Sequence, residues 1–240
     1  MCGIVGYVGG KQAQYVVVEG LRRLEFRGYD SAGIALVHDG KITQDKRAGK
    51  LANLEKAISE TPLPTSSTGI GHTRWATHGA PTDRNAHPHA SAGGRVSVVH
   101  NGIIENFASL RTELEAAGVE LLSETDTEVA AHLLERALGE GVDLTVAMQR
   151  VASALEGAFT LVAIDAHDPD RVVAARRNSP LVVGLGEGEN FLGSDVAAFI
   201  EHTREALELG QDSVVTITRE GVEVTDFAGN PTQGRPYHVD

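Results

Sequence analysis

The sequence has a single cysteine, Cys2, and only one tryptophan and two methionines among its 240 residues. One thiol cannot form a disulfide within the chain, and scarce cysteine is typical of a reducing compartment, so we expect a cytoplasmic protein. No apolar run approaches the roughly 20 residues that a membrane-spanning helix needs. No signal peptide is recognisable either, because Lys11 interrupts the first weakly apolar stretch. We therefore expect no membrane partner.

Basic residues are also in short supply. The chain has 21 Lys and Arg against 33 Asp and Glu, which gives a formal net charge of −12. Nucleic-acid binding needs clustered Lys and Arg that neutralise phosphates, so this balance argues against a general nucleic-acid-binding protein. It leaves small-molecule enzymes open, and 240 residues are enough for one domain with a substantial core.

Amphipathic helical patterns alternate with short strand-like runs along the chain. Apolar residues spaced as i, i+4, i+8 and i+11 predict a helix over residues 11–25. Further helices are predicted over residues 51–58, 107–117, 129–137 and 144–155. Thr125 and Glu128 fit a capping box that would start the fourth of these five helices.

The strand-like runs are joined by turn signals rather than by helices. Asp39-Gly40 and Glu220-Gly221 each separate two such runs, which predicts two hairpins. The runs at 159–164, 172–176, 181–185 and 191–195 are too closely spaced for helical crossovers, so they should pair antiparallel. Antiparallel strands with helices in separate groups predict an α+β fold, and we interpret residues 1–240 as a single domain.

The last segment, residues 229–240, loses this periodicity and carries Gly and Pro. Its composition fits a linker that leads to another part of a longer chain. A frayed natural terminus fits equally well from composition alone.

Cys2 follows the initiator Met, and removal of Met1 would place a thiol and a free α-amine on the same residue. The reference pKa of an α-amine is about 7.7–8.0, close to that of a thiol, so the amine can act as the base that activates the thiol. An N-terminal nucleophile of this kind needs no separate histidine. On position alone, Cys2 is equally well explained as an incidental small apolar residue.

The loop at 72–89, HTRWATHGAPTDRNAHPH, gathers many polar groups. Arg74 has the fork geometry to bind a carboxylate through two parallel hydrogen bonds. Trp75 could seal a pocket against water, and Thr77 could hydrogen-bond a ligand. These roles compete with the ordinary one, in which polar side chains stabilise a long loop.

Three interpretations of the histidines remain open. His78, His87 and His89 could hold a metal, although their spacing matches no familiar zinc pattern. His78 or His100 could be the base of a Cys–His hydrolase. The histidines could also be polar scaffolding that hydrogen-bonds to the backbone. Because of the histidine spacing we expect no metal. We also expect no cofactor, and GLGEGE (184–189) lacks the last glycine of a GxGxxG phosphate-binding loop.

Two further short motifs are ambiguous in the same way. Asn101-Gly102 is a common turn pair, but the Asn101 amide and the Gly102 backbone N–H could also form an oxyanion hole. Asp126, in SETDTE, could simply favour a helix start, or it could bind a substrate ammonium. Together with Arg74, it would then recognise a free α-amino acid.

Taken together and in order, these motifs resemble a known family. MCGIVGYVG, RRLEFRGYDSAG, HTRWATHGAP, NAHPH, HNGIIEN and SETDTE look like the N-terminal glutaminase domain of the glutamine–fructose-6-phosphate aminotransferases, the glucosamine-6-phosphate synthases. The resemblance covers essentially the whole chain. CGIVG alone would indicate only a class II, N-terminal-nucleophile amidotransferase. One departure is Phe26, where the family pattern usually has Tyr.

The resemblance implies a four-layer αββα sandwich of two antiparallel sheets, the N-terminal-nucleophile (Ntn) hydrolase fold. It also implies glutamine hydrolysis through a γ-glutamyl thioester on Cys2. By resemblance, the remaining site residues are Asn101 and Gly102 at the oxyanion hole, Arg74 on the α-carboxylate, Asp126 on the α-amine, Thr77 and His78 lining the site, Trp75 on a mobile loop and Arg27 orienting the site.

The same resemblance implies partners. The substrate would be L-glutamine, and the ammonia would pass to a C-terminal isomerase half that binds fructose 6-phosphate, in a chain that is a homodimer at full length. We then expect these 240 residues to release ammonia from glutamine without making the sugar phosphate. Two alternatives stay open: the Cys–His hydrolase, and a module that senses an amino acid without turnover.

Overall fold

The computed structural model describes residues 2–240, and its strands form two antiparallel sheets. The larger sheet has the strand order β14-β11-β9-β10-β1-β4-β2-β3, and the smaller has the order β13-β12-β8-β7-β6-β5. Two hairpins that the turn signals predict are present, β2 with β3 and β12 with β13. At the first of these turns Asp39 and Gly40 have φ of 50° and 70°, the left-handed conformation that a two-residue hairpin turn requires.

The bounds of the strands are as follows. The larger sheet consists of β1 (Gly3–Val8), β2 (Ser31–His38), β3 (Lys41–Ala48), β4 (Thr68–Arg74), β9 (Val182–Leu185), β10 (Asn190–Gly193), β11 (Glu205–Glu208) and β14 (Arg235–His238). The smaller sheet consists of β5 (His89–Ala90), β6 (Val96–Gly102), β7 (Phe159–Asp165), β8 (Asp168–Arg177), β12 (Ser213–Ile217) and β13 (Val222–Asp226).

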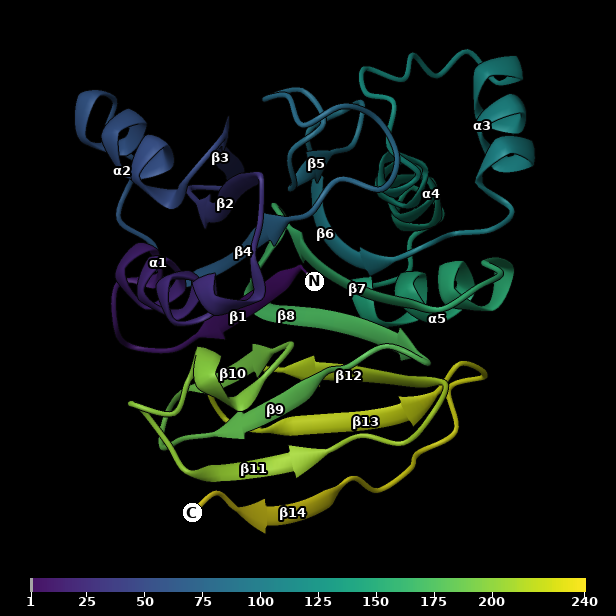
Figure 1. Ribbon diagram of the computed structural model, residues 1–240. Coiled ribbons are helices and arrows are strands. Elements are labelled where there is room, and N and C mark those ends of the chain that lie inside the picture. Colours follow the sequence, from purple (N-terminus) through teal and green to yellow (C-terminus); the bar gives the residue numbers. More distant parts are fainter. Residues whose placement is uncertain (1) are drawn as a thin grey trace.

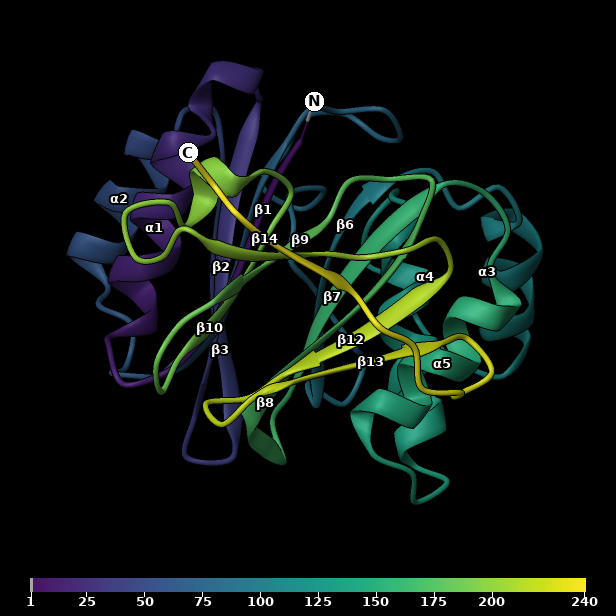
Figure 2. The same cartoon turned by 90° about the horizontal axis from the view of Figure 1, so that it is seen from below.

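Helices cover the outer face of each sheet. The helices are α1 (Ala13–Arg23), α2 (Leu51–Glu60), α3 (Phe107–Ala116), α4 (Thr127–Leu138) and α5 (Leu144–Ala154), with short 3₁₀ turns at Glu25–Arg27 and Val196–Ala198. Figure 1 shows α1 and α2 on one side of the molecule and α3, α4 and α5 on the other. Figure 2 shows the layers in the order helices, sheet, sheet, helices. This is the four-layer sandwich that the resemblance implies.

Burial on both faces explains why β1 has an unbroken apolar sequence. Ile4 and Val8 face the second sheet and join the core between the sheets, whereas Val5 and Tyr7 join the core beneath α1. Period-two alternation therefore divides one strand between two cores, and every side chain from Gly3 to Val8 is buried. A third core lies between the smaller sheet and α4 and α5.

Two expectations from the sequence are corrected. Asp126, not Thr125, precedes the first residue of α4, and the hydroxyl of Thr125 pairs with His89 instead of capping the helix. Glu128 accepts hydrogen bonds from the backbone N–H groups of Leu122 and Ser123, so it closes the loop before the helix, and the predicted capping box is wrong.

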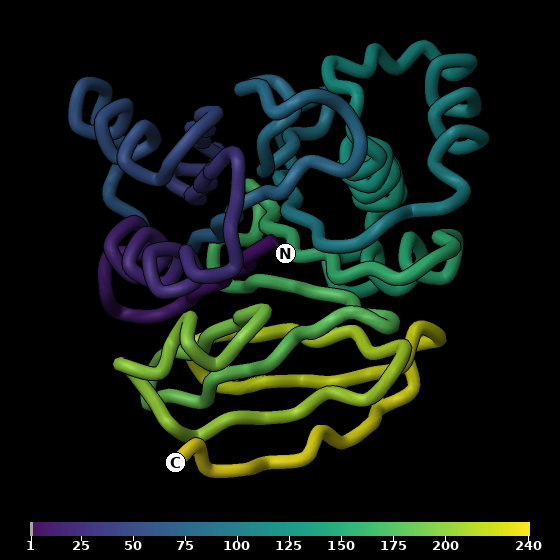
Figure 3. The backbone as a smooth tube through the Cα atoms, viewed as in Figure 1, coloured from purple at the N-terminus to yellow at the C-terminus, as the bar shows by residue number. Residues whose placement is uncertain are grey.

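The second correction concerns residues 229–240, where the sequence predicted no regular structure. Residues 235–238 form β14, which pairs antiparallel with β11 at the edge of the larger sheet. The tube in Figure 3 shows this yellow end of the chain beside the green strands β9 to β11. Among residues 2–240, no helix has the length and apolar character that crossing a membrane would demand.

Candidate active site

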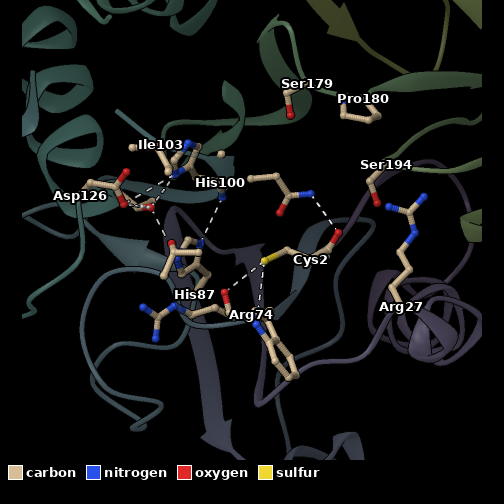
Figure 4. Close-up of a pocket in the computed structure, with 15 residues that line it drawn as sticks. Cys2, Arg27, Arg74, His87, His100, Ile103, Asp126, Ser179, Pro180 and Ser194 are labelled. Carbon is tan, nitrogen blue, oxygen red and sulfur yellow. Dashed lines mark hydrogen bonds and ion pairs between the residues drawn. The ribbon is translucent and has the colours of Figure 1, made fainter. Parts of the chain in front are cut away.

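A pocket of about 390 Å³ lies where the start of β1 meets the ends of β4 and β6. Antiparallel pairing places Gly3 opposite Thr73, so Cys2 comes next to the residues that end β4. Figure 4 shows the pocket with Arg27 and Asp126 on opposite sides of Cys2. The lining residues are Cys2, Arg27, Arg74, Trp75, Thr77, His87, His100, Asn101, Gly102, Ile103, Asp126, Thr127, Ser179, Pro180 and Ser194.

The Cys2 thiol is held by the backbone that follows β4. Its Sγ accepts a hydrogen bond from the Trp75 N–H at 3.1 Å. Burial raises the pKa of the Cys2 thiol, and the Trp75 hydrogen bond lowers it by a smaller amount. The thiol form therefore predominates at neutral pH, so a nucleophilic Cys2 needs a base to remove its proton.

Asn101 lies beside Cys2 with both ends of its amide engaged. Nδ2 donates to the Cys2 carbonyl oxygen at 3.1 Å, and Oδ1 lies 2.9 Å from His72 Nε2. An amide nitrogen carries two N–H groups, so one remains after the bond to Cys2. The Asn101 side chain can therefore offer a free N–H donor close to Cys2, the candidate nucleophile.

Gly102 supplies a second donor of the kind that an oxyanion hole requires. The next residue, Ile103, donates its N–H to Ala158, and His100 donates its N–H to a His87 ring nitrogen. Since successive N–H groups of a strand point to opposite edges, the Gly102 N–H points away from β7, as that of His100 does. Gly102 has φ of +114°, and a Cβ there would lie 2.1 Å from the Ala158 oxygen, so only glycine fits.

Arg74 is the last residue of β4 and is 3% exposed. Its guanidinium donates to the backbone oxygens of the following loop, to Ala80 at 3.2 Å and also to His78. Burial lowers its pKa, while Asp30 and Asp126 act in the opposite direction, and an arginine in this environment remains charged. Arg74 thus brings a fixed positive charge to the pocket and also anchors the loop at 78–80.

Asp126 supplies a buried negative charge on the side of Cys2 away from Arg27 (Figure 4). Its Oδ2 accepts a hydrogen bond from the Ile104 N–H at 2.8 Å, and its Oδ1 lies 4.0 Å from His100 Nδ1. Arg74 and Asp126 therefore give the pocket fixed charges of opposite sign, which suit a zwitterionic ligand with a free α-carboxylate and α-amine.

Of the other predicted site residues, three line the pocket and one does not. Thr77 lines the pocket, and so does Trp75, a residue that is 55% exposed. Arg27 also lines the pocket, with its guanidinium in an ion pair with Asp195 at 2.9 Å. His78 is not among the lining residues; its ring packs against Phe107, with the ring centroids 5.1 Å apart.

The histidines form a buried group whose contacts fit the scaffolding interpretation. His72 and His87 stack at 4.1 Å with an interplanar angle of 10°, and His87 Nδ1 accepts the His100 N–H at 3.2 Å. His89 and His100 each pair with a threonine hydroxyl. Burial lowers the pKa of all four rings, in the case of His72 to about 3, so they are neutral at pH 7.

Neither alternative role for the histidines has geometric support. Within residues 2–240, the hydrogen bonds of the Cys2 thiol go to the Trp75 backbone and none goes to a histidine ring. In the same range, no group of three or more His, Cys, Asp or Glu side chains has the arrangement of a metal site. The contacts of the described residues therefore favour the scaffolding interpretation of the histidines.

Sequence reasoning missed several lining residues. Ser194 accepts the Ile4 N–H at 3.0 Å through its hydroxyl, and Thr127 contacts His100 from the start of α4. Ile103, Ser179 and Pro180 also line the pocket. Thr127 falls inside the SETDTE motif and could have been noticed there. Ser179, Pro180 and Ser194 follow strands far along the sequence, and no local pattern marks them.

Comparison with known proteins agrees with this geometry. A family model described as "Glutamine amidotransferase domain" matches residues 72–201, which is more than half of the chain. The chain belongs to this family. Two solved structures share its fold over 96% of its length and half of theirs: the glutamine phosphoribosylpyrophosphate amidotransferase of B. subtilis (26% identity, TM-score 0.79) and an allosteric regulatory enzyme of purine biosynthesis (27%, 0.81).

The curated relatives point to a narrower group. The chain is 66% identical, over its whole length, to the glutamine–fructose-6-phosphate aminotransferase (isomerizing) of Streptomyces coelicolor, and 60% identical to that of Mycobacterium tuberculosis. These matches confirm the resemblance that the motifs indicated. The chain spans about 40% of the length of these relatives.

Proposed function

We propose that this chain hydrolyses L-glutamine to glutamate and ammonia through a γ-glutamyl thioester on Cys2. The single observation that carries the proposal is the pocket itself, in which the Cys2 thiol lies beside Asn101 and Gly102, with Arg74 and Asp126 providing one charge of each sign. Membership of the glutamine amidotransferase family and the names of the relatives support the choice of glutamine.

The proposed reaction begins after removal of Met1, when the α-amine of Cys2 takes the thiol proton, directly or through a water molecule. The thiolate attacks the γ-carbonyl carbon, and the oxygen becomes negatively charged. N–H groups of Asn101 and Gly102 stabilise this charge, a contribution of about 3–4 kcal/mol per donor in other enzymes. The protonated amine then gives its proton to the leaving nitrogen, ammonia departs, and water hydrolyses the thioester.

Substrate recognition follows from the two fixed charges. Arg74 binds the α-carboxylate and Asp126 the α-amine, while Thr77 lines the site and Trp75 closes over the bound glutamine. Arg27, which forms an ion pair with Asp195, orients the site.

In the whole protein, we propose that the ammonia is used to make glucosamine 6-phosphate from fructose 6-phosphate in a C-terminal isomerase half. Residues 229–240, which include β14, would lead toward that half. The full-length chain would work as a homodimer in the cytoplasm. The names and lengths of the curated relatives support the aminotransferase reaction and the presence of a C-terminal half.

The decisive experiment is mass spectrometry after treatment with a glutamine-like electrophile such as diazo-oxo-norleucine. We expect one adduct, on a Cys2 whose α-amine is free, and ammonia release from glutamine that stops as the adduct forms. A Cys2→Ala variant is the matched control and should remain unlabelled. Absence of an adduct on a protein that has lost Met1 would refute the proposal.

An uncleavable residue placed before Cys2 separates the mechanisms. If the α-amine is the base, this extension abolishes ammonia release, because the amine becomes an amide. A Cys–His hydrolase would tolerate the extension and lose activity on replacement of His78 or His100. An amino acid sensor would bind glutamine in every variant without releasing ammonia.

A further inference from the structure

His72 is a fully buried residue of β4 that contacts the Asn101 amide without lining the pocket. Its Nε2 lies 2.9 Å from Asn101 Oδ1, and the Nδ2 of the same amide donates to the Cys2 carbonyl oxygen at 3.1 Å. The two ends of the Asn101 amide are therefore held by different partners. Because Nδ2 faces a carbonyl, Oδ1 must face the histidine, and His72 must be the donor of that hydrogen bond.

The protonation state of His72 suits this role. Burial lowers its pKa to about 3, so the ring is neutral throughout the range near neutral pH and carries one N–H. Asn101 Oδ1 lies 2.9 Å from Nε2 and can only accept a hydrogen bond, so the single ring proton belongs on Nε2.

The ring is also fixed in place. His72 pairs with Ile4 of β1 on one side and Gly33 of β2 on the other, so it lies in an interior strand of the larger sheet. Its ring stacks on His87, whose own Nδ1 accepts the His100 N–H. These contacts connect His72 to β6, the strand that carries Asn101.

An asparagine amide can rotate by 180° and exchange its oxygen and nitrogen with little change in shape. In the rotated position Asn101 would direct an acceptor oxygen at the developing oxyanion, and would repel it. The Nε2–H of His72 disfavours that rotation, because the amide NH₂ would then face another donor.

We propose that His72 is a positioning residue of the reaction, which fixes the orientation of the Asn101 amide so that Nδ2 is the atom offered to the oxyanion. This inference rests on the proposed glutaminase activity. His72 does not touch the substrate, and it acts only through Asn101. Misplacing a catalytic group by about 1 Å can lower a rate 100-fold, so the effect on kcat should be large.

The test compares His72→Leu, which has a similar size and no donor, with His72→Gln, whose amide can still donate to Asn101. We expect kcat for glutamine to fall about 10- to 100-fold in His72→Leu, with KM within about threefold of the original, because a misoriented donor affects the transition state. His72→Gln should keep most of kcat. Equal losses in the two variants, or a change confined to KM, would overturn the inference.

Two controls separate positioning from general damage. The rate of Cys2 alkylation by iodoacetamide involves no oxyanion, so it should be the same in His72→Leu as in the original protein. In an Asn101→Ala background, His72→Leu should cause no further loss of kcat, because the residue through which it acts is gone. Independent, additive losses would contradict the proposal.

A spectrum of the unaltered protein tests the same point without any variant that might misfold. With ¹⁵N-labelled histidine, the His72 ring should show a protonated Nε2 and an unprotonated Nδ1, unchanged from pH 8 to pH 6. The opposite tautomer would overturn the inference. If the original protein releases no ammonia from glutamine, the proposed function fails, whereas full activity in His72→Leu refutes this inference alone.

Discussion

Arg74 performs two tasks that need a guanidinium. It donates to the backbone oxygens of residues 78–80, and it brings a positive charge to the pocket that Asp126 also lines. Lysine has a single ammonium on a flexible chain, and it cannot present a planar fork to a carboxylate while it also bonds to several carbonyl oxygens.

We therefore expect Arg74→Lys to raise KM for glutamine at least tenfold while kcat stays within a few-fold. Steady-state ammonia release measures both constants, and thermal unfolding should show a change of only a few degrees. Arg84→Lys is the matched control, because Arg84 lies on the same loop in an exposed ion pair with Glu124. An unchanged KM in Arg74→Lys would remove Arg74 from glutamine binding.

At the scale of elements, β3 holds the His-rich loop in place through Lys46. Its Nζ donates to the carbonyl oxygens of Ala86 at 2.9 Å, Pro88 at 3.0 Å and Arg84 at 3.3 Å. Burial lowers the pKa of Lys46 to about 8, so it is still mostly protonated at pH 7. The three N–H groups of its ammonium match the three carbonyl oxygens.

Lys46→Met should destabilise this connection, because the carbonyl oxygens lose a charged donor. We expect the free energy of unfolding to fall by about 1–3 kcal/mol in urea titrations. Hydrogen exchange should become faster at residues 84–89. Lys41→Met, at the exposed end of the same strand, should change neither quantity. Equal protection of residues 84–89 in the two variants would show that Lys46 does not hold the loop.

For the whole molecule, the buried histidines make stability depend on pH. His72, His87, His89 and His100 have folded-state pKa values lowered by burial, whereas unfolded histidine titrates near 6.5. Below that pH the unfolded chain binds protons that the folded chain excludes. The stability that these neutral histidines contribute is therefore fully present above pH 6.5, and it declines as the pH falls below 6.5.

We expect the free energy of unfolding to decrease from pH 7.5 to pH 5.5, by up to about 1 kcal/mol per pH unit for each buried histidine. Urea titrations at several pH values measure the slope. Near pH 5.5, His89→Gln should reduce that slope by about 1 kcal/mol per pH unit. His38→Gln replaces an exposed histidine and should leave the slope unchanged. Identical slopes in the original protein and His89→Gln would show that His89 does not contribute to the pH dependence of stability.

Local regularities made most elements predictable. The apolar faces of α1 and α2, the turn at Asp39-Gly40 and the closely spaced strands from 159 onward can be read from periodicity and turn chemistry. The exposed strand β14 could not, because only pairing with β11 makes residues 235–238 a strand. The start of α4 was misassigned because the Thr125 hydroxyl is used by His89, a contact across 36 residues.

By itself, the sequence determined the class of fold, the family and the candidate residues Cys2, Arg74, Asn101, Gly102 and Asp126, because these depend on short motifs and their order. The tertiary structure decided which of them meet. Antiparallel pairing of β1 with β4, and the stacking of two sheets, bring three distant motifs to one pocket. Burial then keeps His72 neutral, and that depends on neighbours that no local pattern reveals.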